Sequence, residues 1–150
     1  MLIDKQNQFS ADAGDSPTTI GATASTNIVD LGIARDIGGA VTDQLMLLCE
    51  VTTAFTSGGS GTLQVQFQTA PDNGSGSPGA WSTLAQSDAI PVASLAQGYK
   101  FLPGELPGGT QRFVRLNYVI GAAAMTAGVL KAALVPSLDV QPVYARGYVA

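Results

Sequence analysis

The chain has 150 residues, of which 12% are charged and 45% apolar, and its formal net charge is −4. This length suits one domain around a single core, and seven scattered Lys and Arg residues argue against a dedicated nucleic-acid binder. The absence of histidine excludes Ser-His-Asp and Cys-His sites and removes the commonest metal ligand.

The pattern along the chain predicts an all-β protein. Short runs rich in Val, Ile, Leu and Phe alternate with clusters of Gly, Pro, Asn and Ser, and no stretch has a convincing helical period. Eight antiparallel strands favour a jelly-roll-like β-sandwich, although periodicity does not fix the strand order. The predicted strands lie at 26–31, 44–53, 62–69, 81–86, 88–91, 98–102, 111–120 and 127–135.

We expect extended arms on both sides of a sandwich domain at 26–135. Residues 1–25 precede the first clear strand, and prolines at 136 and 142 exclude residues 136–150 from a central strand. The last segment places Tyr144 and Tyr148 around Arg146, which suits a contact arm, although a disordered terminus is equally consistent with it.

The strand predicted at 62–69 has an unusual polar side. Its apolar residues alternate with Gln64, Gln66 and Gln68, where an ordinary soluble domain would be expected to place lysines and glutamates. The whole chain shares this scarcity of charge, because charged residues usually make up about 25% of a protein.

No segment indicates secretion or membrane insertion. The N-terminus has Asp4 and Lys5 where a signal peptide needs an apolar run, and the uncharged run between Arg115 and Lys131 is too short to cross a bilayer. Cys49 lies in a run typical of a buried strand, so we interpret it as an inert core thiol.

The candidates for chemistry are weak. Two carboxylate pairs, Asp12 with Asp15 and Asp30 with Asp36, lie beside turn glycines, where aspartate is an ordinary loop residue. The loop that follows Pro71 lacks the spaced acidic ligands of a calcium site, and the glycine-rich "SGGSGT" lacks the lysine of a phosphate loop. The sequence predicts no enzyme, no metal and no cofactor.

Arginines in two segments are candidates for contacts. In "DLGIARDIGG", Arg35 stands between Asp30 and Asp36, which fits either a local ion pair or a contact with another molecule. In "RFVRLN", the spacing of Arg112 and Arg115 places them on opposite faces of a strand, so they cannot form one basic patch.

Several segments resemble those of the capsid cement, or decoration, proteins of short-tailed bacteriophages. They are "MLIDKQNQFS", "STNIVDLGIARDIGG", "VTTAFTSGGSGTL", "AIPVASLAQGYKF", "LPGGTQRFVRLNY" and "MTAGVLKAAL", and together they span roughly residues 1 to 135. The resemblance implies a jelly-roll sandwich that self-associates and sits on the outside of an icosahedral head, where it bridges subunits of the major capsid protein.

The resemblance also implies partners and a place. The partners are the major capsid protein and a second copy of the chain, in a homodimer rather than a trimer, with no nucleic acid, membrane or small-molecule substrate. The protein would be made in the host cytoplasm and reside on the outer surface of the virion. Scarcity of charge is then an interface property, because unpaired charges are costly to desolvate and glutamine avoids that cost.

The expected capsid or inter-subunit contacts are apolar and charged side chains of the arms and loops. The alternative for the apolar groups Leu2, Ile3, Phe9 and Phe55 is that they fold back over the open end of the sandwich itself, and for Phe55 the two interpretations are equal. The contact residues are Leu2, Ile3, Phe9, Arg35, Asp36, Phe55, Tyr144, Arg146 and Tyr148.

A rival function comes from another class. Jelly rolls also serve as lectins, so a phage tail or spike module that binds host glycans is an alternative. Its sugar would stack on an exposed aromatic ring, and Trp81 is the only tryptophan in the chain.

Overall fold

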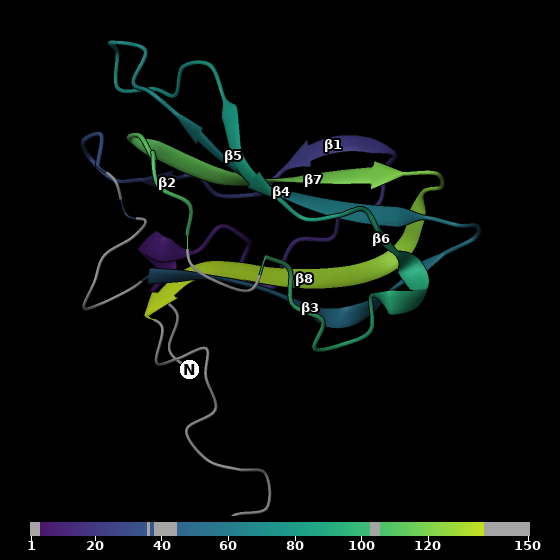
Figure 1. Cartoon of the computed structure of the whole chain (residues 1–150). Coiled ribbons are helices and arrows are strands. Elements are labelled where there is room, and N and C mark those ends of the chain that lie inside the picture. Colours follow the sequence, from purple (N-terminus) through teal and green to yellow (C-terminus); the bar gives the residue numbers. More distant parts are fainter. Residues whose placement is uncertain (1–3, 36, 38–44, 103–105, 137–150) are drawn as a thin grey trace, which may run out of the picture.

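Two antiparallel sheets face each other and enclose the core between them (Figure 1). The computed structural model describes residues 4–35, 37, 45–102 and 106–136. Within them the eight-stranded all-β sandwich is confirmed, and the helices described are two short 3₁₀ turns, η1 (Lys5–Asn7) and η2 (Val92–Ser94). The strands are β1 (Gly21–Ala24), β2 (Val29–Asp30), β3 (Leu45–Ser57), β4 (Thr62–Ala70), β5 (Ser82–Gln86), β6 (Ile90–Pro91), β7 (Phe113–Gly121) and β8 (Met125–Pro136).

The strands divide unevenly between the sheets. The larger sheet has the order β1-β7-β4-β5, with β2 also paired to β7 and β6 to β4, whereas the smaller sheet consists of β3 and β8. The chain passes from β3 to β4 and from β7 to β8, so the paired strands of one sheet continue as the central pair of the other. One two-stranded ribbon therefore folds across both layers, which gives the sandwich its jelly-roll-like character.

An extended segment covers one edge of the smaller sheet. The predicted strand at 98–102 forms a single bridge, Glu50 to Lys100, rather than a full strand. Its backbone still bonds to β3, because Val51 N–H donates to the Tyr99 carbonyl at 2.8 Å and the Phe101 N–H donates to the Cys49 carbonyl at 2.8 Å. This pairing covers backbone groups that would otherwise leave β3 as an open edge.

The expected N-terminal arm is wrong for the part of it that the structure describes. Phe9 N–H donates to the Ala132 carbonyl at 2.8 Å, which places this segment along the other edge of the smaller sheet. Further on, β1 pairs with β7 and belongs to the larger sheet. Its sequence "GATA" lacks apolar alternation, so periodicity gave no signal for a strand there.

The expected C-terminal arm, apart from Pro136 at the end of β8, lies outside the described residues.

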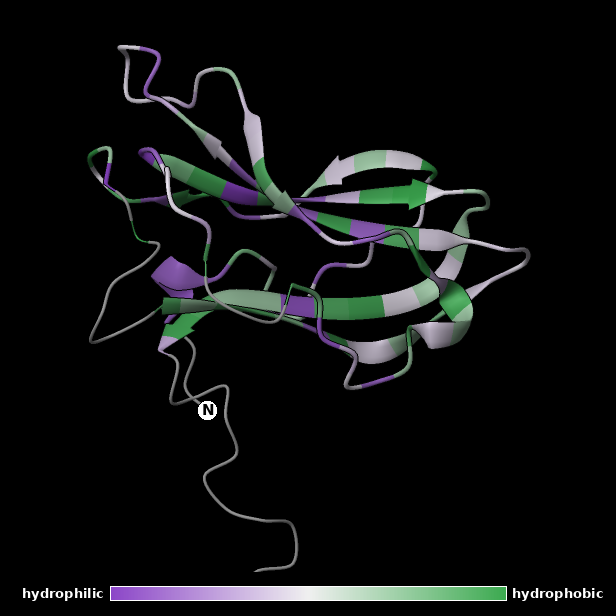
Figure 2. Cartoon of the chain, in the orientation of Figure 1, coloured by the Kyte–Doolittle hydropathy of each residue, from purple (hydrophilic) through white to green (hydrophobic). Residues whose placement is uncertain are grey.

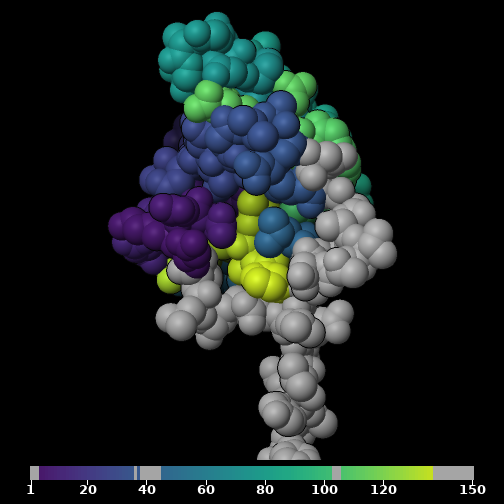
Figure 3. Space-filling model, turned by 90° about the vertical axis from the view of Figure 1, so that its left-hand side faces the viewer, coloured from purple at the N-terminus to yellow at the C-terminus, as the bar shows by residue number. Residues whose placement is uncertain are grey.

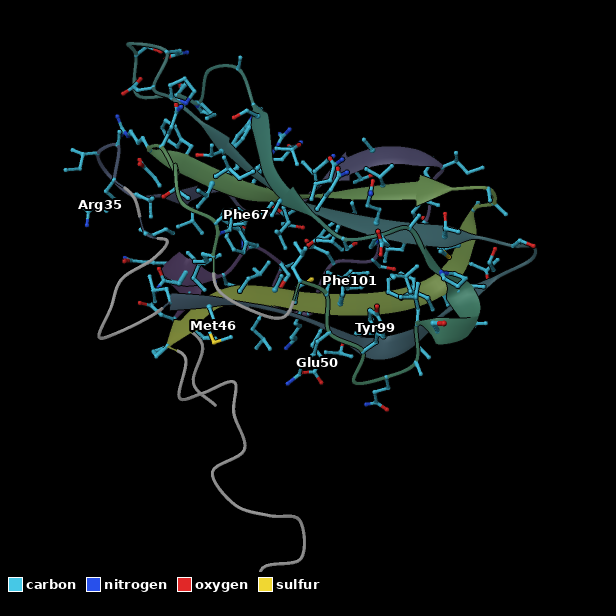
Figure 4. The ribbon with its side chains drawn as sticks, in the orientation of Figure 1. Arg35, Met46, Glu50, Phe67, Tyr99 and Phe101 are labelled. Atoms are coloured by element: carbon cyan, nitrogen blue, oxygen red, sulfur yellow. The ribbon has the colours of Figure 1, made fainter. Side chains whose placement is uncertain are left out.

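The core lies between the sheets, and β4 supplies its share of it by alternation. On β4 the side chains of Leu63, Val65 and Phe67 are completely buried, and the bands of colour along β4 and β7 in Figure 2 show the same alternation. Phe67 packs edge-on against Phe9, with ring centroids 6.2 Å apart. Figure 4 shows Phe67 directed between the two layers.

Phe9 and Phe55 are core residues, which corrects the expectation that they are exposed contact groups. Phe9 is 0% exposed and Phe55 is 4% exposed. The Phe55 ring lies against Gly128, where an added Cβ would come within 2.2 Å of a ring carbon, and Gly128 has a φ of +135° that other residues rarely adopt. For both residues the structure supports the alternative, in which the side chain packs against the sandwich itself.

Candidate interaction surface

The outer side of the larger sheet carries a network of side-chain amides. Gln66 lies at its centre: its Oε1 accepts from Asn117 Nδ2 at 2.8 Å and from Gln68 Nε2 at 3.3 Å, and its Nε2 donates to Gln86 Oε1 at 3.2 Å. Gln68 Nε2 also donates to Thr83 Oγ1 at 3.1 Å. We call this surface the amide face, and it consists of Gln64, Gln66, Gln68, Thr83, Gln86 and Asn117.

The amide face follows from the register of three strands. Gln66 on β4 lies opposite Asn117 on β7 and Gln86 on β5, so the same positions that point away from the core bring these amides together. Because an amide both donates and accepts, neighbours on adjacent strands satisfy one another without any charge. The glutamines of β4 are therefore a cross-strand network, and such a surface is cheaper to desolvate than one built from ionised groups.

One cation interrupts this neutral surface. The Arg115 guanidinium lies 4.1 Å from the centroid of the Trp81 ring, and its Nε donates to Gln68 Oε1 at 3.0 Å. Burial lowers the pKa of Arg115 from its ordinary value. The arginine covers one face of the Trp81 indole, so that ring face is not open to a stacked sugar.

A second arginine holds together the loops at one end of the sandwich. Arg112 Nε donates to Asp30 Oδ1 at 2.9 Å, its Nη2 donates to Asp30 Oδ2 at 3.0 Å, and its Nη1 pairs with Asp72. The hydrogen bond from Arg112 lowers the pKa of Asp30. The cluster joins the end of β2 to the loop after β4, and that loop (teal) stands at the top of the end of the molecule that faces the viewer in Figure 3.

The loop after β4 is an ordered turn, as predicted. Asp72 Oδ1 accepts from the backbone N–H groups of Gly74 and Gly76 at 2.8 and 2.9 Å, and these bonds, with that from Arg112, lower the pKa of Asp72. Asn73 accepts from Ser75 N–H in the same way, at 2.9 Å. The carboxylate is committed to backbone and arginine donors, which fits the interpretation of this segment as a turn.

The structure corrects the expected partner of Asp30. Its ion pair is with Arg112, 82 residues away, and not with the nearby Arg35. Arg35 is exposed and points away from the strands (Figure 4). It lies at the end of the sandwich that carries the loops after β2 and β4, which we call the loop end. Its carbonyl accepts from Thr110 Oγ1 at 2.8 Å, which anchors the backbone there. The remaining predicted contacts lie outside the described residues: Leu2, Ile3, Asp36, Tyr144, Arg146 and Tyr148.

Three isoleucines form exposed apolar positions that the sequence reasoning did not single out. Ile20, Ile28 and Ile33 are 58%, 45% and 64% exposed, whereas most large apolar side chains of the described residues are buried or half-buried. Ile28 immediately precedes β2, and Ile33 belongs to the loop that follows it. Periodicity gives no signal for them, because Ile28 falls within the strand predicted at 26–31, where an apolar side chain is expected to face the core.

The titratable groups of the interior serve structural roles. Asp15 is buried and accepts hydrogen bonds from Tyr118 Oη at 2.9 Å, from Ala11 N–H at 3.1 Å and from Thr26. Burial raises the pKa values of both the Tyr118 hydroxyl and the Cys49 thiol. Neither group is therefore ionised near neutral pH, and the expectation that Cys49 is a buried core thiol is confirmed.

Within residues 4–35, 37, 45–102 and 106–136, no cluster of three or more His, Cys, Asp and Glu side chains could hold a metal ion. The helices in the described part of the chain include none that is long and apolar enough to cross a membrane.

The model of the protein family Bbp16 matches residues 14–134 of the chain. The chain belongs to the Bbp16 family. The matched segment contains every strand of the larger sheet and nearly all of the smaller one, so the amide face and the Arg112 cluster both lie within the part that defines this Bbp16 protein. No curated protein matches the chain.

Proposed function

We propose that this Bbp16 protein is a structural protein of a virion, a cement or decoration protein that binds the outside of an icosahedral phage head and bridges subunits of its major capsid protein. The observation that carries the proposal is the amide face. It is a broad, hydrogen-bonded and nearly uncharged outer side of a sheet. This surface chemistry suits burial against another protein.

Energy considerations favour a rigid protein that bridges two capsid subunits. A shell that contains DNA under pressure tends to separate at subunit boundaries, and a rigid domain that touches two subunits raises the free energy of separation by the sum of modest contacts. Rigidity comes from the two hydrogen-bonded sheets and the buried core between them. Few strong individual contacts are needed.

The exposed isoleucines supply a second surface of different chemistry. Ile28 and Ile33 flank β2 and stand apart from the amide face in character, because they are apolar and carry no hydrogen-bonding side chain. We assign self-association, most simply a two-fold homodimer, to such apolar positions. Sedimentation at micromolar concentration tests this part, and a clean monomer would leave self-association without support.

The decisive experiment compares heads with and without the protein. Purified heads that lack the chain are saturated with it, occupancy is measured by gel densitometry, and the temperature and the mechanical force at which DNA is released are recorded. We expect higher thresholds in the occupied heads, and the gain should persist in chelator because no metal is involved in the mechanism. Equal thresholds at full occupancy would reject cementing and leave passive decoration.

A further inference from the structure

Arg115 is held in place by the fold, and among the described residues its charge has no ion-pair partner. Trp81 supports one face of the guanidinium, and Gln68 accepts the hydrogen bond of its Nε. Gln68 is itself fixed by its bonds to Gln66 and Thr83. Both the plane and the direction of the guanidinium are therefore set before any partner arrives.

The two terminal nitrogens of Arg115 remain available. Among the described residues, no carboxylate lies within ion-pair distance of Arg115, and no hydrogen bond engages its Nη1 or Nη2. No buried side-chain nitrogen or oxygen of the described residues lacks a partner, so these two atoms are in contact with solvent. In Arg112, three residues earlier, the corresponding nitrogens are both paired within the chain, Nη2 with Asp30 and Nη1 with Asp72.

We propose that Arg115 and Trp81 form a carboxylate-recognition site, at which an aspartate or glutamate side chain of the major capsid protein binds Nη1 and Nη2 in a bidentate pair. The inference rests on the proposed function, and it names the chemistry of the partner. A planar guanidinium presents two parallel N–H groups that match the two oxygens of a carboxylate. Arginine and tryptophan are also the residue types that most often dominate the binding energy of interfaces.

Charge complementarity favours a different protein over a second copy of this chain. The strands of the larger sheet contain one carboxylate, Asp30, and that group is already paired with Arg112. The strands of a copy placed on this face by a two-fold axis would bring Arg115 and more amides, and their one carboxylate is already paired. The partner must therefore supply the negative charge, and the overall charge of −4 makes nucleic-acid phosphate a poor source of it.

The test measures binding of the full-length protein to heads that lack it, by co-sedimentation over a range of salt concentrations. We expect Arg115→Gln to weaken binding about tenfold or more and to reduce its salt dependence, because a desolvated charge pair is lost. Arg115→Lys keeps the charge but loses the planar guanidinium and its stacking on Trp81. Its affinity for heads should therefore lie between that of the unaltered protein and that of Arg115→Gln. Melting temperatures from circular dichroism establish that each variant is folded.

The matched control is Arg112→Gln, which removes an arginine from the same region. Because the partners of Arg112 belong to the chain itself, we expect less than about a fivefold change in binding from this variant. Gln68→Glu provides an independent variant: it places a carboxylate beside Arg115, neutralises it within the chain, and should weaken binding although the arginine is still present.

The outcomes separate the two proposals. If the unaltered protein binds heads and Arg115→Gln and Gln68→Glu bind equally well, the carboxylate site is wrong and the proposed function stands. If the unaltered protein does not bind heads, both are overturned. Binding of duplex DNA that depends on Arg115 would identify phosphate as the anion and also reject the site as proposed.

Discussion

The two sides of β4 differ in almost every physical respect although they alternate along the same nine residues. The inner side carries Leu63, Val65 and Phe67, which are fully buried, and the outer side carries glutamines that bond to neighbouring strands. The inner side contributes transfer free energy, which scales with the apolar area removed from water. The outer side gains little stability from bonds that water could replace, so its composition is free to serve recognition.

The largest expected loss of stability comes from disrupting the packing on the inner side of β4. Phe67→Ala should lower the free energy of unfolding by about 3–5 kcal/mol, because it removes a fully buried ring and leaves a cavity next to Phe9. Urea denaturation followed by fluorescence or circular dichroism measures the loss. Phe67→Leu is the matched control and should cost less, and equal costs would show that the cavity does not decide the effect.

The next effect probes a polar group on the inner side of β7. Tyr118→Phe removes the hydroxyl that donates to Asp15 at 2.9 Å, and we expect a loss of about 1–3 kcal/mol because the acceptor is a buried side-chain oxygen. Tyr99→Phe is the control, since no hydrogen bond of the Tyr99 hydroxyl occurs among the described residues. Equal melting curves for the two variants would contradict a stabilising role for the bond.

A smaller loss is expected on the outer side. Gln66→Ala removes three amide hydrogen bonds, yet water reaches this surface and replaces part of what is lost, so we expect about 1 kcal/mol or less. Gln64→Ala removes a single bond, to the Ser87 carbonyl at 2.8 Å, and should cost still less. A loss at Gln66 as large as that at Phe67 would erase the distinction between the two sides.

Sequence periodicity predicted the strands whose inner sides are strictly apolar and failed where contacts are long-range. The alternation around Phe67 predicted β4 almost to its ends, whereas β1 has small residues and no pattern, and it forms because β7 offers an edge. Burial of Phe9 depends on a ring 58 positions later in the chain, which no local pattern encodes.

The ion pairs show the same limit of prediction. Asp30 was expected beside Arg35 because those residues are close in sequence, but the fold brings Arg112 to it across the sheet. The glutamines of the outer side were visible from alternation, whereas their network and the lone Arg115 required the register of three strands. Alternation thus predicted which side the residues of β4 face, and the pairing of strands decided their partners.

The smallest expected effect separates the two arginines by pH. Arg112 holds two carboxylates whose pKa values are lowered in the folded protein, so their contribution is present above the ordinary aspartate pKa of about 3.9 and is lost as the pH falls through the lowered values. Arg115 is bound by the Gln68 amide, which does not titrate. Nitrogen-15 spectra of the arginine Nε–H groups from pH 7 to about pH 2.5 should therefore show the Arg112 signal moving below about pH 4, while the Arg115 signal stays in place until the protein unfolds.

Asp30→Asn should reduce the movement of the Arg112 signal and leave that of Arg115 unchanged. Movement of both signals with one midpoint would mean that acid loosens the whole sheet, and that the loop end and the amide face are not independent.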